Sequence, residues 1–166
     1  MLFRSSRQAT GAAASNLDLY QVNCTYLDAL AGNARDYLLA RAIQFFLPGV
    51  PQVYYVGLLG GRNDMELLAQ SKVGRDINRH HYSAGEIDAA LQTPLVQRLL
   101  QLMSLRNHHP AFDGEFSLLE TGASALALRW TQGPHLAELR LDFADPSQHQ
   151  LRFSQDGQPD LLLRLD

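Results

Sequence analysis

One apolar segment, VPQVYYV at Val50–Val56, constrains the fold of this chain more than any other stretch. It is rich in β-branched and aromatic residues and is bounded by Pro51 and Gly57, which predicts a strand buried on both faces. A strand covered on both faces needs parallel neighbours in the same sheet. Because the sequence contains no such neighbour upstream, we expect the segment to belong to a larger α/β fold.

Helical patterns flank the expected strand on both sides. The helix before it is predicted from an N-cap residue, Asn33, followed by apolar residues at helical spacing as far as Phe46. After the strand, short helices are predicted at Met65–Gln70 and Gly85–Leu91. A longer helix, Pro94–His108, is predicted from the helix start Thr93-Pro94 and from apolar residues at helical spacing.

The pattern changes after about Ala111, where apolar and polar residues alternate with period two. We expect a small antiparallel sheet of four or five strands, with Trp130 in its core. In the segment LAELRLDF, one face is predicted to be apolar, with Ala137, Leu139, Leu141 and Phe143, and the other polar, with Glu138, Arg140 and Asp142.

A polar loop, Val73–Ser83, follows the expected strand, at the place where α/β folds put their sites. An arginine and an aspartate on a loop can bind vicinal hydroxyls or a phosphate, because guanidinium offers bidentate donors. The alternative, favoured by spacing alone, is that Arg75, Asp76 and Arg79 pair only with one another. The candidate residues in this region are Arg62, Asn63, Asp64, Arg75, Asp76, Asn78, Arg79, His80 and His81.

Composition and motif spacing argue against several classes of function. The net charge of −3 gives no basic surface for nucleic acid. Adjacent histidine pairs and the absence of a Cys/His cluster argue against a metal site, and no phosphate-binding loop or dinucleotide fingerprint predicts a cofactor. No apolar run is long enough to predict a membrane span or a signal peptide. The single cysteine, Cys24, favours a cytoplasmic location.

Four long segments carry a family resemblance: GAAASNLDLYQVN, ARAIQFFLPGVPQVYYVGLLGG, NDMELL and GRDINRHHYS. They resemble the sucrose phosphorylase family, the phosphorylases of glycoside hydrolase family 13 in the α-amylase superfamily. The resemblance extends from about Gln8 to about Phe116. It implies an α/β fold in which residues 1–110 are the C-terminal part of a (β/α)8 TIM barrel, with the last helices and strand 8. Residues 111–166 are then expected to form a small antiparallel all-β domain.

The resemblance also implies a retaining reaction, in which sucrose and phosphate give glucose 1-phosphate and fructose. The family's three catalytic acidic residues lie on earlier barrel strands, upstream of Met1, so we expect no catalytic residue here and no activity from this chain alone. Alternatives are a related phosphorylase acting on glucosylglycerate, glucosylglycerol or sucrose 6-phosphate, and a non-catalytic remnant that docks onto a complementary barrel fragment. A sugar-binding module is a further, weaker alternative.

Residue roles follow from matching the family's motifs. Arg75 in GRD is expected to clamp the glucosyl unit, Asp18 and Gln21 to bind fructose hydroxyls, and Tyr20 to contribute to the phosphate-bound arrangement. The expected ligands are sucrose or a related α-glucoside, inorganic phosphate and glucose 1-phosphate, without a cofactor or metal. The expected substrate-binding residues are Asp18, Leu19, Tyr20, Gln21, Arg75 and Arg79.

Overall fold

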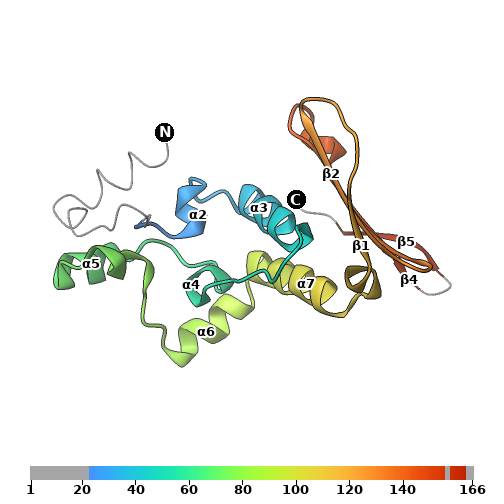
Figure 1. The fold of residues 1–166 in the computed structure, drawn as a ribbon. Helices are drawn as coiled ribbons and strands as arrows, with labels where there is room; N and C mark the ends of the chain where they lie inside the picture. The colour runs from blue at the N-terminus through green and yellow to red at the C-terminus, as the bar shows by residue number, and fades with distance from the viewer. Residues whose placement is uncertain (1–22, 156–157, 164–166) are drawn as a thin grey trace. The chain divides into compact units, whose positions relative to one another are not determined.

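A computed structural model describes residues 23–155 and 158–163, and the backbone folds into two compact units (Figure 1). The first unit comprises Met1–Tyr37 and Gln52–Gln97, and the second comprises Leu38–Pro51 and Arg98–Asp166. Helices α3 (Ala34–Phe46) and α7 (Pro94–His108) each contribute residues to both units. The predicted domain boundary at residue 110 stays a prediction.

The first unit consists of short helices whose ends are set by local capping. Asn33 caps α3 as predicted, because its Oδ1 accepts hydrogen bonds from the N–H groups of Arg35 and Asp36 at 3.0 and 3.2 Å. Ser83 and Glu86 form a capping box at the start of α6. The predicted helices are confirmed to within a residue at each end. The remaining elements of this unit are α2 (Tyr26–Ala29), α4 (Tyr55–Leu58), α5 (Met65–Ser71), the 3-10 helix η2 (Gly74–Asn78) and α6 (Ala84–Leu91).

The segment predicted as a buried strand, Val50–Val56, forms no strand in the structure. Val50 is 90% exposed, and helix α4 begins at Tyr55. Tyr54 keeps an extended backbone, with φ −69° and ψ 147°. The physical reason is that a strand needs neighbours for its backbone N–H and C=O groups, and every strand in the described residues belongs to one antiparallel sheet. Tyr54 and Tyr55, which a strand buried on both faces would enclose, are 55% and 38% exposed.

The second unit is built on the predicted antiparallel sheet, which has five strands in the order β1-β2-β3-β4-β5. Each strand pairs with the next one along the chain, as in a meander. Strand β1 was not among the strand candidates in the sequence, because its four residues are too few for alternation to be recognised. The elements are η3 (Pro110–Asp113), β1 (Glu115–Leu118), β2 (Ala125–Gln132), β3 (His135–Asp142), η4 (Pro146–Gln148), β4 (Gln150–Gln155) and β5 (Gln158–Leu163).

Trp130 lies in the core of this unit, as predicted. Its side chain is 8% exposed, and its indole Nε1 donates a hydrogen bond to the backbone oxygen of Phe46 at 2.7 Å. The ring of Phe112 packs edge-on against Phe46 and close to Trp130, and the guanidinium of Arg106 lies over both the Phe112 and Trp130 rings. This aromatic cluster connects the end of α3 to strand β2.

Strand β3 departs from simple alternation at two positions. Phe143, predicted on the apolar face, is 59% exposed because β3 ends one residue earlier, at Asp142. Glu138, predicted on the polar face, is only 1% exposed. The register places Arg129 of β2 and Arg152 of β4 directly opposite Glu138, one on each side. A carboxylate between two arginine-bearing strands can therefore be buried with its charge compensated.

Candidate functional site

A glycine turn after α4 leads the chain into the candidate site. Gly60 has φ +63°, a conformation that favours glycine. A Cβ atom at Gly61 would collide with the hydroxyl of Tyr82 and with Val56. This position therefore accepts only glycine without displacement of its neighbours. The turn delivers Asn63 and Asp64 to the start of α5, where Asp64 is the N-cap.

Asn63 anchors the segment that precedes α2. Its Oδ1 accepts a hydrogen bond from the N–H of Thr25 at 2.7 Å, and its own N–H donates to Asp28 Oδ2 at 2.6 Å. The amide nitrogens of Asn63 and Asn78 approach Sγ and the backbone oxygen of Cys24, each at 3.5 Å. The segment next to the predicted acceptor loop is thus attached to both Asn63 and the η2 turn.

We expect the substitution Asn63→Ala to release this segment. Thr25 is buried, and the substitution would remove the acceptor of its N–H group. A buried donor left without an acceptor lowers the free energy of unfolding by about 1–3 kcal/mol. Hydrogen exchange of the Thr25 amide and urea unfolding would measure both effects. Asn107→Ala, at an exposed position in α7, is the matched control, and equal exchange in the two variants would contradict the anchoring role.

The structure places Arg75 in η2 and Arg79 at its C-terminal cap, and both side chains are exposed. The neighbours Gly74 and Ile77 are buried, and their packing fixes the backbone of the turn. Arg75 lies at the surface. Within the described residues no ion pair joins Arg75, Asp76 and Arg79, so the self-pairing alternative is wrong for this structure. The other four predicted substrate-binding residues, Asp18, Leu19, Tyr20 and Gln21, lie outside the described residues.

His80 joins two carboxylates close to this turn. Its Nδ1 lies 2.6 Å from Asp64 Oδ2, and its Nε2 lies 3.1 Å from Glu86 Oε1. The backbone N–H of Leu67 and then the His80 side chain hold the pKa of Asp64 below its usual range. Hydrogen bonds from the Ser83 backbone and hydroxyl, with a further one from His80, lower the pKa of Glu86 to about 2. Both carboxylates are therefore charged acceptors at neutral pH.

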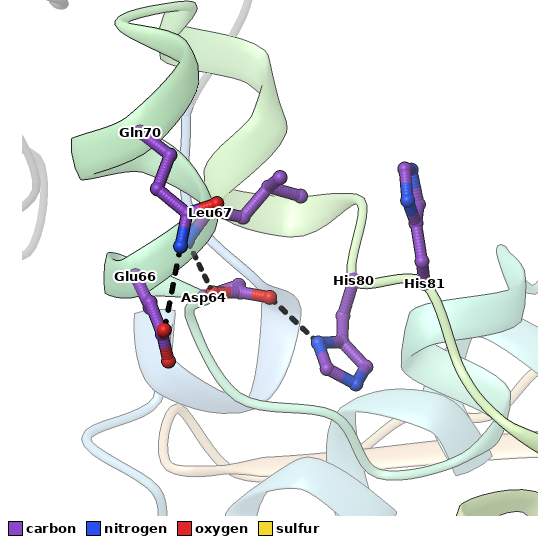
Figure 2. A pocket seen from close by; sticks show the side chains of 6 residues that line it. All are labelled: Asp64, Glu66, Leu67, Gln70, His80 and His81. Atoms are coloured by element: carbon purple, nitrogen blue, oxygen red, sulfur yellow. Dashed lines mark hydrogen bonds and ion pairs between the residues drawn. The ribbon is translucent and has the colours of Figure 1, made fainter.

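An open cavity of about 170 Å³ lies beside the His80 contact. Figure 2 shows the His80 ring directed toward Asp64, whereas the ring of the adjacent His81 is directed away from it. Asp64 and His80 were candidates from the sequence, but Glu86 was missed. The spacing of Ser83 and Glu86, which is that of a capping box, was the sequence signal that could have identified Glu86. The residues that line the cavity are Asp64, Glu66, Leu67, Gln70, His80 and His81.

The described residues hold no cluster of three or more His, Cys, Asp or Glu side chains that could bind a metal ion. None of the helices in the described ranges has the length and apolar character needed to cross a bilayer.

A solved structure that resembles this chain defines its class of fold. The solved structure of sucrose 6F-phosphate phosphorylase from Thermoanaerobacter thermosaccharolyticum matches with a TM-score of 0.83 and 40% identity, over 90% of this chain and 30% of that one. The helices and the small antiparallel sheet are therefore the C-terminal piece of a glycoside hydrolase family 13 phosphorylase, with its barrel helices and sheet domain. The predicted fold class is confirmed.

Sequence relatives identify the family. The chain is 63% identical over 139 residues to a sucrose phosphorylase of Agrobacterium vitis, matching 84% of this chain and 28% of that protein. It is 52% identical over 124 residues to a glucosylglycerol phosphorylase of Marinobacter adhaerens, matching 75% of this chain and 26% of that protein. No family model matches the chain. The chain belongs to the sucrose phosphorylase family, and it spans about a quarter to three tenths of the length of these relatives.

Proposed function

We propose that this chain supplies the glucosyl-clamp side of a retaining α-glucoside phosphorylase, with sucrose and inorganic phosphate as substrates. In this reaction phosphate intercepts a glucosyl–enzyme intermediate, and glucose 1-phosphate and fructose are released. Arg75 clamps the glucosyl unit, and Asp18, Tyr20 and Gln21 handle the acceptor and phosphate. The nucleophile, the acid/base and the third acidic residue come from a complementary barrel segment, and the reaction takes place in the cytoplasm.

The observation that carries this proposal is the exposed Arg75 on a turn that is fixed by buried neighbours. Gly74 and Ile77 are buried, whereas Arg75 offers its guanidinium to solvent. A guanidinium on a fixed backbone can donate two parallel hydrogen bonds to vicinal hydroxyls or to a paired carboxylate. The attachment of Cys24 and Thr25 to Asn78 and Asn63 supports the same proposal, because these two residues follow the predicted acceptor loop closely in the sequence.

The names of the relatives favour specific alternatives for the acceptor. A glucosylglycerol phosphorylase is 52% identical to this chain, and a sucrose 6(F)-phosphate phosphorylase is 48% identical. The sucrose phosphorylase of Agrobacterium vitis is more similar, at 63%, which favours sucrose as the donor. A non-catalytic role as a docking partner is the alternative in which the chain binds a barrel segment without completing a site.

We expect the purified 166-residue chain to release no glucose 1-phosphate from sucrose and phosphate. Retaining glycosyl transfer needs two positioned carboxyl groups, and the family resemblance implies that this pair lies on earlier barrel strands. A coupled assay for glucose 1-phosphate would test the chain alone and after co-expression with a complementary barrel segment from a relative. Turnover by the chain alone would contradict the proposed division of the site, and a folded but inactive complex would favour the docking role.

A further inference from the structure

Asp64 contacts the η2 turn at Ile77 and the chain just after the turn at His80. Its backbone N–H donates to the oxygen of Ile77 at 2.7 Å, and its side-chain Oδ2 lies 2.6 Å from His80 Nδ1. Ile77 is fully buried, and Arg75 lies two residues before it. The position of the chain just after Arg75 is therefore fixed by one backbone bond to Asp64 and one side-chain bond that passes through His80.

The far side of the His80 ring is held by the first turn of α6. Glu86 Oε1 lies 3.1 Å from His80 Nε2, while Glu86 Oε2 accepts hydrogen bonds from the N–H and hydroxyl of Ser83, both at 2.7 Å. The Tyr82 ring packs edge-on against the imidazole, with centroids 4.5 Å apart. The hydroxyl of Tyr55 donates to the His80 backbone oxygen at 3.0 Å. His80 therefore connects α4, α5 and α6.

The two carboxylate contacts decide the protonation state that fits this geometry. An ionised carboxylate can only accept hydrogen bonds, and a neutral imidazole has a single N–H to donate. Both contacts are hydrogen bonds only when both ring nitrogens of His80 carry a proton. We propose that His80 is a positioning residue whose imidazolium form ties Asp64 to Glu86 and thereby holds the Arg75 turn, Gly74–Asn78, in its binding geometry.

The groups around the ring favour this charged form. The hydrogen bond to Asp64 raises the pKa of His80 above its ordinary 6.5, and the bond to Glu86 adds to that effect although partial burial opposes it. The other groups that face the ring or its backbone are the phenols of Tyr82 and Tyr55, whose pKa values burial raises further, so they stay neutral. Arg79 precedes His80 in the chain and is exposed.

The raised pKa of His80 sets the sign of the pH effect on the turn. Because the folded-state pKa of His80 is raised, the tie is fully formed below about pH 6.5 and is lost as the pH rises through the raised value. Above that pH one of the two carboxylates loses its hydrogen bond from His80. The Arg75 turn is then held by the Asp64–Ile77 backbone bond and by a single side-chain bond.

Backbone hydrogen exchange on the full 166-residue chain tests this role without any assay of activity. The reporters are the amides of Asp76 and Arg79, which donate to Val73 and Asp76 at 3.0 and 3.1 Å within the turn. His80→Gln is expected to lower their protection about tenfold at pH 6, the size expected for one charge-assisted hydrogen bond. His81→Gln is the matched control, because its ring is directed away from Asp64, and it should leave the protection unchanged (Figure 2).

A second variant keeps the fold while it removes one charge. Glu86→Gln retains the capping box, since glutamine also serves at this position, but it takes away the negative partner of Nε2. Relative to the His81→Gln control, the loss of protection with rising pH should move to lower pH in Glu86→Gln. Equal protection in His80→Gln and His81→Gln at every pH would overturn the proposal.

The inference rests on the proposed function only for what Arg75 binds, and the two can fail separately. If exchange in the turn depends on His80 while Arg75→Ala keeps full turnover in the reconstituted enzyme, the positioning role stands and the glucosyl clamp is wrong. If Arg75→Ala abolishes turnover while His80→Gln leaves amide exchange in the turn unchanged, the clamp stands and the positioning role is overturned.

Discussion

Replacing Glu138 with glutamine is expected to lower the free energy of unfolding by about 3 kcal/mol, the lower end of the range for breaking a buried ion pair. Glu138 is 1% exposed, and its carboxylate accepts hydrogen bonds from Nε of Arg129, Arg140 and Arg152 at 2.6, 2.6 and 3.2 Å. Glutamine keeps the shape but satisfies fewer of these donors. The arginine side chains are 31–46% exposed and can regain water, which favours the lower end of the range.

Urea unfolding followed by circular dichroism would measure this effect, with Glu115→Gln as a control at an exposed position of strand β1. The control should change the free energy of unfolding by less than about 0.5 kcal/mol. Equal midpoints for the two variants would show that the arginine cluster adds nothing to stability.

The same cluster predicts how stability depends on pH. Burial raises the pKa of Glu138, but hydrogen bonds from Arg140, Arg129 and Arg152 outweigh it and hold the value below the ordinary 4.5. The contribution of Glu138 is therefore fully present above about pH 4.5 and is lost as the pH falls through the lowered folded value. The difference between the wild-type chain and Glu138→Gln should shrink in strongly acidic solution.

The substitution Arg75→Ala is expected to lower kcat/KM for sucrose phosphorolysis about 10²–10³-fold in the enzyme reconstituted with a complementary barrel segment. Alanine removes both parallel donors of the clamp and leaves the backbone turn intact, because the buried residues there are Gly74 and Ile77. Arg75→Lys should recover little activity, since an ammonium group cannot form the bidentate contact.

Lys72→Ala is the matched control for this experiment, because Lys72 is an exposed cation three residues before Arg75. It changes the local charge equally and should leave kcat/KM within a factor of about two. Wild-type turnover by Arg75→Ala would reject the clamp and favour a solvated role for the arginine. Equal losses in both variants would point to overall charge and not to a specific contact.

The elements that were predicted correctly are those whose signals are local. Asn33 caps α3, and the start of α7 at Thr93-Pro94 was recognised, because a cap interacts within four residues of itself. The alternating strands of the sheet were recognised for the same reason, since alternation is read along one strand. Strand β1 was too short to carry that signal.

The failures have a common physical origin in partners far away in the sequence. Val50–Val56 has the composition of a buried strand, but a strand forms only where another strand supplies hydrogen-bond partners. Glu138 was expected on a polar surface, yet Arg129 and Arg152 lie opposite it on the flanking strands and allow its burial. No pattern within one strand contains this information.

For the candidate site, the sequence by itself determined the family motifs and the polar loop that carries GRD. Those motifs are contiguous, so neighbouring residues suffice to recognise them. Only the tertiary structure decided that Asn63 and Asn78 hold the segment before α2, and that His80 lies between Asp64 and Glu86. These contacts join residues up to 54 positions apart, and their geometry depends on where the chain turns back on itself.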